Sequence, residues 1–351
     1  MTNKKTYELS PMTLLSPSAL QKKLSLKTDQ EASIAAHRSL IKDLVTGKDP
    51  RLAIIVGPCS LHSKDSALEY AHRLYALQSK VDKTCVLVMR AHIEKPRTCL
   101  GWKGLLYDPS LTGKDDIING LFESRKLLLE LVHTNVPLAS EFLDPLTSCY
   151  FSDLISWGFI GARTSTSQIH RQLASSLAMP VGFKNSIDGS IESVIQGALA
   201  AQHPHSFLQI DAMGMVGVTK SLGNSASHIV LRGSDTGPNY DPYSVNSAIK
   251  TAHELNLKSR ILIDCSHGNS QKDPTNQKRV LDSIVTQHIE GNPHILGVMM
   301  ESHLEGGSQS FNSSSLSPSI SLTDPCLSWP ETEELLLLVN ERLSSSLCSC
   351  T

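Results

Sequence analysis

The stretch "LAIIVGPCSLH", residues 52–62, opens with five apolar residues and ends in a turn that carries a cysteine. A run this short fits a strand that is buried on both faces, and Gly57-Pro58 would end it. Similar short apolar runs recur along the chain. The predicted strands are 52–56, 85–89, 136–142, 158–162, 180–184, 228–232, 260–264 and 295–301.

Amphipathic segments with helical spacing separate most of these runs. In residues 66–77, Leu68, Ala71, Leu74 and Tyr75 would share one face, and Ser66 and Glu69 have the spacing of a capping box. Comparable patterns occur at 190–201, 243–255 and 277–291. Strands that alternate with helices form parallel sheets, and eight such units predict an α/β fold of the (β/α)₈ TIM-barrel type, which typically needs about 250 residues.

The barrel would occupy about residues 51–345, with a tail at 346–351. An N-terminal extension, residues 1–50, precedes it and contains one predicted helix near 29–46. Residues 207–224 resemble a β-hairpin that turns near Gly214 and is inserted before the sixth barrel strand. Neither addition is needed to close a barrel, so both are candidates for assembly or regulation.

Composition excludes several classes of protein. Hydrophobic residues make up 40% and charged residues 19%, and the formal net charge is -2, which argues against a nucleic-acid partner or a membrane surface. The sequence has neither a secretory signal nor an apolar segment long enough to span a bilayer. Its eight cysteines have no paired spacing, so we expect a reduced, cytoplasmic protein.

Basic residues gather where the predicted strands end. Active sites of TIM barrels lie at the carboxyl ends of the strands, so these residues would meet on one rim. Anions such as phosphates and carboxylates would compensate the crowded cations. The alternative, that each is a solvated surface charge, explains a single residue but explains six in register poorly. The six are Arg90, Lys95, Arg97, Arg163, Lys184 and Arg232.

A second group follows the first, seventh and eighth strands and consists of Cys59, His267, Glu301 and Asp324. One sulfur, one imidazole and two carboxylates suit a divalent ion such as Mn²⁺, Fe²⁺, Co²⁺ or Zn²⁺. Taken alone, Cys59 would be a small buried hydrophobe, and a nucleophilic role is weaker because no base lies beside it. The other cysteines near the motifs, Cys99, Cys265 and Cys326, and the histidines His170 and His228 are interpreted as structural.

Several blocks, in this order, resemble the signatures of the microbial type I 3-deoxy-D-arabino-heptulosonate 7-phosphate (DAHP) synthases. They are "GPCS", "KPRT", "GWKG", "GART", "GFKN", "LRG", "DCSHGN" and "SLTDPCLSW", and the resemblance spans roughly residues 10–345. It implies a metal-dependent transferase that condenses phosphoenolpyruvate with erythrose 4-phosphate and releases phosphate. This is the first step of the shikimate pathway, which leads to chorismate and the aromatic amino acids. The family also suggests a homodimer or homotetramer built through the N-terminal segment.

The resemblance assigns roles by position. The metal ligands would be Cys59, His267, Glu301 and Asp324. The phosphoenolpyruvate site would comprise Arg90, Lys95, Arg163, Lys184 and Arg232 with the backbone of Ala162. The erythrose 4-phosphate site would comprise Lys95, Pro96, Arg97, Thr98 and Asp324. Lys95, Arg163, Lys184 and His267 are the expected catalytic residues, with Lys95 as the candidate proton donor and Glu141 orienting water.

The chain departs from the family pattern at four places. His92 replaces an aromatic residue, "GSDTG" (233–237) replaces a shorter basic loop, Thr147-Ser148-Cys149 replaces a segment with proline and glutamine, and Ala178 replaces a serine. The last two changes lie in the inhibitor pocket of feedback-sensitive members. The candidate residues for binding an aromatic amino acid here are Ser148, Cys149, Ala178 and Phe207.

Two other functions stay open at this stage. One is the related condensation with arabinose 5-phosphate, as in 3-deoxy-octulosonate 8-phosphate synthases, which the "KPRT" and "GWKG" blocks disfavour. The other is a catalytically inactive regulatory barrel, which would be expected to lack a ligand or a basic rim residue; all of them are present.

Overall fold

The computed structural model describes residues 13–97, 101–258, 260–312 and 315–349, with the side chains of 348 and 349 left out. Eight parallel strands follow the predicted runs closely and form one closed sheet. They are β1 (Leu52–Gly57), β2 (Cys85–Arg90), β3 (Leu138–Glu141), β4 (Trp157–Ile160), β5 (Val181–Lys184), β8 (Ser227–Leu231), β9 (Ile261–Asp264) and β10 (Ile295–His303). The predicted barrel is confirmed.

Pairing of the last barrel strand with the first closes the sheet. The strand order is β1-β2-β3-β4-β5-β8-β9-β10, and β10 pairs in parallel with β1. In this register Gly57 lies opposite Glu301, and Met299 on the other edge of β10 lies opposite Asp264. The carboxyl ends of β1, β9 and β10 are therefore neighbours, so residues far apart in the sequence meet at one end of the barrel.

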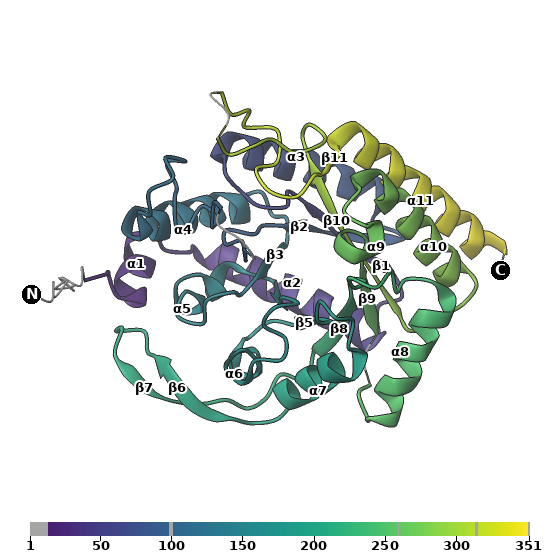
Figure 1. The fold of residues 1–351 in the computed structure, drawn as a ribbon, viewed down its shortest axis with the longest axis horizontal. Coiled ribbons are helices and arrows are strands. Elements are labelled where there is room, and N and C mark those ends of the chain that lie inside the picture. The colour runs from purple at the N-terminus through teal and green to yellow at the C-terminus, as the bar shows by residue number, and fades with distance from the viewer. Residues whose placement is uncertain (1–12, 98–100, 259, 313–314, 350–351) are drawn as a thin grey trace, which may run out of the picture.

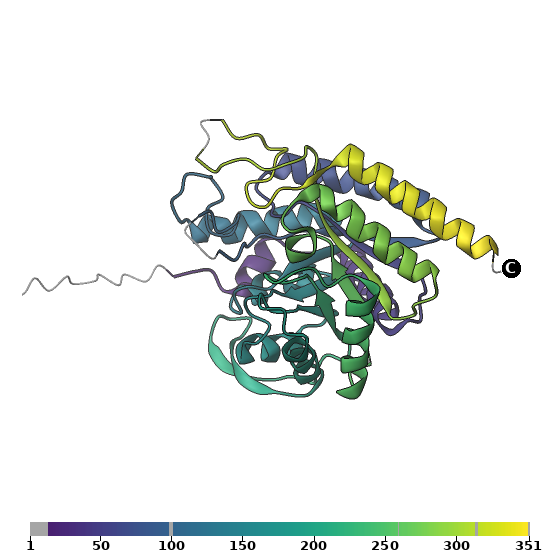
Figure 2. The ribbon, with the colours of Figure 1, turned by 45° about the vertical axis from the view of Figure 1, so that its right-hand side comes forward.

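Helices cover the outside of the strands (Figure 1). Their bounds are α3 (Lys64–Val81), α4 (Ile117–His133), α6 (Gln168–Ser176), α7 (Ile191–Gln202), α8 (Pro242–Glu254), α10 (Gln277–Ile289) and α11 (Trp329–Ser349). Short helices α5 (Ser148–Phe151) and α9 (His267–Ser270) and two 3₁₀ turns, η1 (Ser152–Leu154) and η2 (Pro274–Asn276), lie in the loops. Helix α11 lies beside α3 and α10 in Figures 1 and 2.

One helix start differs from its prediction. Helix α3 begins at Lys64 after the cap residue Ser63, whereas Ser66 lies inside the helix and donates a hydrogen bond to the carbonyl of Ser63. Ser66 and Glu69 therefore do not form a capping box. Tyr75 is 53% exposed and lies off the buried face, which Tyr70 occupies instead. The buried face is centred on Ala67, Ala71 and Leu74 with Tyr70 beside them, so Tyr75 lies at its exposed edge.

The barrel interior is a packed core, and helix α2 (Thr28–Thr46) closes it at the end where the strands begin. Side chains from the strands, such as Trp157 and Phe159, form one cluster with Ile41 and Leu44 of α2. Arg260, just before β9, donates hydrogen bonds to the carbonyls of Leu44 and Pro293, which fixes α2 at the amino ends of the strands. The opposite, carboxyl ends are thus left for the site. The predicted helix at 29–46 is confirmed.

A two-stranded antiparallel hairpin lies outside the barrel, with β6 (Ser206–Ile210) and β7 (Val216–Lys220). Gly214 turns it with a φ of +81°, a conformation that glycine adopts readily. Both strands run along the edge of the molecule in Figure 1, and Ser18 of helix α1 (Pro17–Lys23) donates a backbone hydrogen bond to Ala212. The predicted insertion is confirmed. The proposed division into extension, barrel and tail stays a prediction.

The segment between β10 and α11 carries one more short strand, β11 (Leu327–Ser328), which pairs with the end of β10 at Ser302 and His303. A serine-rich segment, 308–321, precedes it and has no helix or longer strand among its described residues. This pairing brings Asp324 back over the barrel mouth. Among the described residues, no helix has the length and apolar character to cross a membrane.

Candidate active site

A cavity of about 450 Å³ opens at the carboxyl ends of the strands. Most residues predicted for the site line it: Arg90, Lys95, Pro96, Arg97, Glu141, Ala162, Arg163, Lys184, Arg232, His267 and Asp324. Thr98 lies outside the described residues. Ile187, Asp235 and Lys272 also line the cavity and were not predicted. All three come from loops, where no sequence period indicates which side chains face inward.

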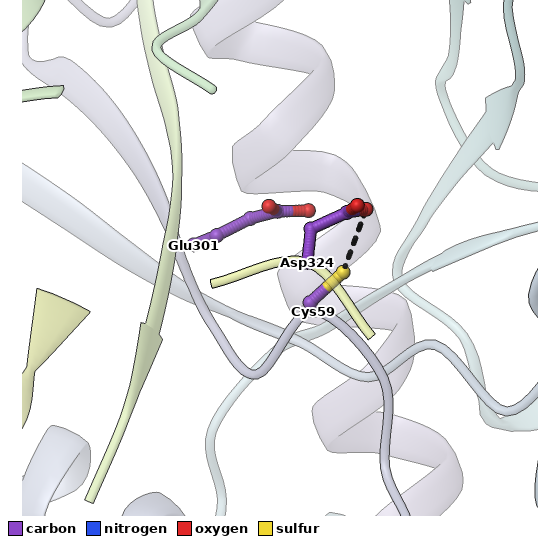
Figure 3. Close-up of side chains that lie close together, drawn as sticks. All are labelled: Cys59, Glu301 and Asp324. Carbon is purple, nitrogen blue, oxygen red and sulfur yellow. Dashed lines mark hydrogen bonds between the residues drawn. The ribbon is translucent and has the colours of Figure 1, made fainter. Parts of the chain in front are cut away.

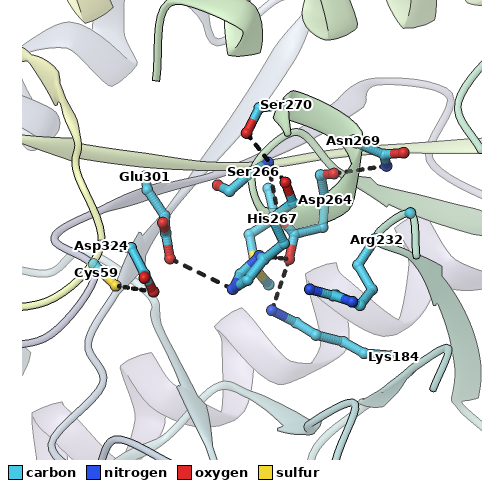
Figure 4. A network of polar contacts seen from close by, with 12 residues as sticks. Cys59, Lys184, Arg232, Asp264, Ser266, His267, Asn269, Ser270, Glu301 and Asp324 are labelled. Carbon is cyan, nitrogen blue, oxygen red and sulfur yellow. Dashed lines mark hydrogen bonds and ion pairs between the residues drawn. The ribbon is translucent and has the colours of Figure 1, made fainter. Parts of the chain in front are cut away.

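Cys59, Glu301 and Asp324 gather at one side of this cavity. Their ligand atoms lie within 4.8 Å of one another, and the Cys59 thiol contacts Asp324 Oδ2 at 3.4 Å, as Figure 3 shows. His267 Nε2 lies 4.0 Å from Glu301 Oε1 and so reaches the edge of this cluster (Figure 4). The structure therefore brings three of the four predicted ligands together and turns the fourth toward them.

The backbone explains why these residues meet. Gly57 and Pro58 end β1, and Cys59 follows beside Glu301 because β1 and β10 are paired at Gly57 and Glu301. The Ser60 and Thr323 hydroxyls form a hydrogen bond of 2.9 Å, which ties the loop that carries Asp324 to the turn after β1.

A buried glutamine fixes the backbone of Glu301. Gln277 accepts a hydrogen bond from the Glu301 N–H at 2.8 Å and donates one to its carbonyl at 2.9 Å. The backbone near Cys59 and the backbone of Glu301, the two predicted ligands at strand ends, are thus both fixed by hydrogen bonds.

The donor set fits a divalent cation. Burial, followed by the negative charge of Glu301, raises the pKa of the Cys59 thiol to about 12. A thiol in such surroundings becomes a thiolate ligand only with a cation beside it. Burial alone would raise the pKa of Asp324, but the Lys95 ammonium outweighs it and holds this pKa below its usual range. Sulfur, imidazole and carboxylate donors match the ligands of borderline transition metals.

Lys95 joins this cluster to the substrate side of the cavity. Its Nζ donates hydrogen bonds to Cys59 Sγ at 2.6 Å and to Asp324 Oδ2 at 2.9 Å. Burial would lower the pKa of Lys95, but the contact with the Cys59 sulfur and the negative charges of Glu301 and Asp324 raise it, so the amine stays protonated. An ammonium at this position can donate a proton or a hydrogen bond to a group that reacts beside the cluster.

Arg90 has a second role that sequence reasoning missed. It is 1% exposed, and its Nη2 pairs with Glu301 Oε1 at 2.8 Å, while its Nε donates to the carbonyl of Pro58. The guanidinium therefore fixes a predicted metal ligand as well as lining the cavity. His92, the unusual residue nearby, is buried, and this burial together with the neighbouring Arg90 charge holds its pKa well below the usual range. It is therefore neutral.

The opposite wall of the cavity is basic. Arg232 follows β8, and its Nη1 is buried without a hydrogen-bond partner among the residues that the structure describes. A buried guanidinium nitrogen without a partner is costly, so an anion in the cavity would compensate it. Arg163 and the backbone of Ala162 lie on the same cavity. This unpaired donor makes the wall suitable for a phosphate.

Lys184 and His267 share a carboxylate that was not predicted. Asp264, the last residue of β9, contacts Lys184 Nζ at 2.8 Å and His267 Nδ1 at 3.0 Å through the same oxygen (Figure 4). Burial would raise the pKa of Asp264, but Lys184 and His267 hold it well below the usual range. A signal did exist in the sequence, because an aspartate ends the otherwise apolar run "RILID".

Asparagines cross-link the loops that carry the basic residues. Asn185 Oδ1 accepts a hydrogen bond from the backbone N–H of Arg232 at 2.8 Å. Asn269 donates to the carbonyls of Leu231 and Asp264 at 3.2 and 2.9 Å. These bonds join the ends of β5, β8 and β9, so the cavity wall is built on fixed backbone. The motifs "GFKN" and "SHGN" contain both asparagines, but the sequence does not indicate their partners.

Glu141 ends β3, lines the cavity and lies against Gly161. A side chain at Gly161 would collide with the Glu141 carboxylate, so the glycine makes room for it. This contact explains why a glycine precedes Ala162 and Arg163.

The predicted inhibitor residues lie around the hairpin. Cys149 on α5 contacts β6, since Gln209 Nε2 and the carbonyl of Ile210 each lie 3.5 Å from its sulfur. Ser148 precedes it, Phe207 lies half-buried on β6, and Ala178 is exposed between α6 and β5. Helix α5 therefore contacts strand β6 of the hairpin through Cys149.

The residues interpreted as structural are buried or bonded to the main chain. His228 contacts Trp157 Nε1 and the carbonyl of Ala226, and His170 contacts the carbonyl of Leu143. Cys265 and Cys326 are buried, and Cys99 lies outside the described residues.

Comparisons with known proteins agree with this architecture. The model of the DAHP synthetase I family matches residues 23–337. The chain is 45% identical over 336 residues, 95% of it and 94% of its relative, to the Tyr-sensitive phospho-2-dehydro-3-deoxyheptonate aldolase of Escherichia coli strain K12. It is 43% identical over 332 residues, 93% of it and 95% of its relative, to the Trp-sensitive enzyme of that name from Buchnera aphidicola subsp. Schizaphis graminum.

A solved structure of phospho-2-dehydro-3-deoxyheptonate aldolase from Francisella tularensis SCHU S4 superposes on the fold with a TM-score of 0.93. It is 38% identical, and the match covers 96% of this chain and 98% of that one. The fold, the sequence identity and the matched family model therefore indicate the same family. The chain belongs to the DAHP synthetase I family.

Proposed function

We propose that the cavity at the carboxyl ends of the strands is where the chain carries out its family's reaction. The chain condenses phosphoenolpyruvate with erythrose 4-phosphate to give DAHP and phosphate, the first step of aromatic amino acid biosynthesis. One observation carries the placement: Arg232, whose buried Nη1 has no partner among the described residues, lines the same cavity as Asp324, which belongs to the cluster with Cys59 and Glu301. An anion site beside a cation site is what this condensation needs.

The basic wall would bind phosphoenolpyruvate. Arg163, Lys184 and Arg232 would hold its phosphate together with the N–H of Ala162, and Arg90 and Lys95 would hold its carboxylate from the other side. Arginine forks fit phosphate and carboxylate in a bidentate manner, which orients the reactive carbon as well as neutralising charge. The enol carbon would then face the second substrate.

Erythrose 4-phosphate would lie across the mouth of the cavity. Lys95, Pro96, Arg97 and Thr98 would bind it, with Asp324 near a hydroxyl group; Arg97 is exposed at the rim, as a phosphate-binding residue there would be. Its aldehyde would then lie beside the cluster.

Cys59, His267, Glu301 and Asp324 would hold one divalent ion, Mn²⁺, Fe²⁺, Co²⁺ or Zn²⁺, and the donor chemistry described above supports this. Such an ion, when bound, supplies Lewis-acid polarisation of the aldehyde carbonyl. Arg90 pairs with Glu301 and would orient that carboxylate as a ligand.

The chain's own groups would carry the remaining steps. As the enol carbon bonds to the aldehyde carbon, the oxygen of the aldehyde gains charge, and the Lys95 ammonium would give it a proton. Water would add to the cationic carbon left on the phosphoenolpyruvate part, with Glu141 as the group that orients it. One proton of the water would return to Lys95, and the other would pass to the phosphate as its bond to the carbon breaks, the ketone forms and phosphate leaves. Arg163 and Lys184 would stabilise the departing anion, since both lie on the cavity wall.

Turnover with the two sugar phosphates tests this reaction. The full chain, loaded with Mn²⁺, is assayed with phosphoenolpyruvate and either erythrose 4-phosphate or arabinose 5-phosphate. We expect product and phosphate with the four-carbon sugar and at least a tenfold lower kcat/KM with the five-carbon one. Preference for arabinose 5-phosphate would support the rival condensation, and no turnover with either would support an inactive barrel.

An aromatic amino acid would bind between α5 and the hairpin, at Ser148, Cys149, Ala178 and Phe207. Support comes from the contact of Cys149 with β6 and from the Tyr-sensitive and Trp-sensitive names of similar enzymes. Activity measured at increasing concentrations of phenylalanine, tyrosine and tryptophan identifies the inhibitor. If none of the three lowers activity, the proposed inhibitor site is wrong.

The hairpin also supports association between copies of the chain into a homodimer or homotetramer. Its outer face exposes large apolar side chains, and Leu208 and Val216 are 74% and 76% exposed. Apolar surface of this kind commonly lies in protein interfaces. Separately, a cytoplasmic location would keep reduced the free thiol that the proposed metal site needs. Sedimentation of the full chain measures the number of copies, and a monomer at all concentrations would contradict the association.

A further inference from the structure

Asp264 is a buried carboxylate between the two halves of the site. It is 0% exposed and ends strand β9. Its Oδ2 accepts a hydrogen bond from Lys184 Nζ at 2.8 Å and lies 3.0 Å from His267 Nδ1, and its Oδ1 accepts one from the N–H of Ser266 at 2.9 Å (Figure 4). None of the roles assigned above involves this residue, although both of its side-chain partners have such roles.

A carboxylate in this position is stable only because its partners compensate it. Burial of an unpaired charge is costly, and Lys184, itself 3% exposed, supplies the opposite charge. The main chain around Asp264 is fixed as well, since Asn269 Nδ2 donates to its carbonyl at 2.9 Å. The carboxylate therefore has one position, and its partners are held relative to it.

The orientation of His267 follows from this contact. With Nδ1 facing Asp264, the ring turns Nε2 toward Glu301, 4.0 Å away. His267 Nδ1 makes no hydrogen bond among the described residues, so its attraction to Asp264 Oδ2 at 3.0 Å is electrostatic. A carboxylate on this side of the ring favours the tautomer that carries its proton on Nδ1 and leaves Nε2 free to bind a cation. The backbone of His267 has a φ of +56°, which is uncommon for a residue with a side chain and keeps the ring over Asp264.

We propose that Asp264 is a positioning residue that couples the two binding sites, because one carboxylate oxygen orients His267 toward the cation and Lys184 toward phosphoenolpyruvate. The inference rests on the proposed function, since it takes from it the roles of His267 and Lys184. Both partners contact the same oxygen, Oδ2 of Asp264. If Asp264 had only a structural role, its replacement would change the stability of the fold but not the metal affinity or the KM values of the folded protein.

Asp264→Asn tests the coupling, since it keeps the shape and removes the charge. Titration calorimetry of the full chain with Mn²⁺ measures metal affinity, and steady-state assays measure KM for phosphoenolpyruvate and for erythrose 4-phosphate. We expect metal affinity to fall about 10- to 100-fold, the effect typical of lost outer partners of metal-binding histidines. KM for phosphoenolpyruvate rises at least about tenfold in parallel, while KM for the sugar phosphate changes less.

Asp282→Asn is the matched control. Asp282 pairs with Arg342 at 2.6 Å on the surface, and its side chain is 70% exposed. The same chemical change there leaves the Mn²⁺ affinity and both KM values unchanged. A folded Asp264→Asn protein with wild-type Mn²⁺ affinity and wild-type KM for phosphoenolpyruvate would overturn the inference.

A double variant covers the case in which Asp264→Asn does not fold. Asp264→Asn with Lys184→Gln removes both charges of the buried pair and is compared with Lys184→Gln alone. Weaker Mn²⁺ binding by the double variant supports the role toward His267, and equal binding overturns it. Failure of the proposed function is a separate result, since the unaltered chain would then bind no Mn²⁺ or form no DAHP.

Discussion

The ammonium group of Lys95 donates a hydrogen bond to the sulfur of Cys59 over 2.6 Å. The candidate proton donor is thus held directly at the candidate cation site. Both groups are buried and Lys95 also lines the cavity, so a reacting oxygen beside the cluster would lie within reach of its ammonium.

We predict that Lys95→Met lowers kcat by about 10²- to 10⁴-fold, the usual contribution of a general acid. Lys80→Met is the matched control, because Lys80 pairs with Glu333 at the surface and outside the signature blocks, and it should keep kcat within about twofold. Circular dichroism verifies that both variants are folded. A Lys95→Met protein that condenses the two substrates at the normal rate would remove Lys95 from the chemistry.

Cys59→Ser should abolish tight metal binding, because a serine hydroxyl is a harder and far less acidic ligand than a thiol. Metal content after dialysis against buffered Mn²⁺ or Zn²⁺ measures this, with about one equivalent expected for the unaltered chain and less than about 0.1 for the variant. Cys149→Ser lies at the hairpin, away from the cluster, and should keep its metal. Full metal content in the Cys59 variant would exclude the thiol as a ligand.

Gly120→Ala should destabilise the fold by about 1–3 kcal/mol. Gly120 lies in α4, and a Cβ there would collide with the backbone carbonyl of Leu106, which leaves no flexible group to give way. Gly217 on β7 has no atom within 4 Å of a Cβ position, so Gly217→Ala is the control and should cost little. Urea unfolding gives both values, and equal stability of the two variants would contradict the packing argument.

Glu94 should make stability depend on pH. Burial raises its pKa from 4.5 to about 8, only partly offset by the hydrogen bond from Thr147, and the carboxylates of Asp144 and Glu141 add to the rise. Between pH 4.5 and 8 the folded state therefore keeps a proton that the unfolded state releases. The free energy of unfolding falls as pH rises through this range, by up to about 1.4 kcal/mol per pH unit.

Glu94→Gln removes this dependence, because an amide does not ionise. We expect the variant to gain stability relative to the unaltered chain between pH 5 and pH 8, measured by urea unfolding at each pH. The difference between the two proteins isolates Glu94 from other titrating groups. A difference that stays constant across this range would show that Glu94 is ionised in the folded state.

Most of the fold was predictable because it depends on periodicity. Short apolar runs set the strands, and closure of eight of them placed Cys59, Glu301 and the basic residues at one end. The start of α3 was not predictable from the apolar pattern, because Ser63 and Ser66 are equally good cap residues and only the folded chain selects one.

Side-chain pairing was beyond the sequence. Arg90 was assigned to a substrate, yet it also pairs with Glu301, and Asp264 was given no role although it contacts Lys184 and His267. Which of several buried charges meet depends on rotamers and on strand register within a few ångströms, and residue spacing does not encode this.

The most direct test of the account is product formation by the chelated enzyme as metal is returned. The full chain is stripped with a chelator, supplied with phosphoenolpyruvate and erythrose 4-phosphate, and titrated with Mn²⁺ while DAHP is measured. The account predicts no DAHP without metal and a linear rise that reaches its plateau near one equivalent. Full turnover by the stripped protein, or no DAHP at any metal concentration, would contradict it.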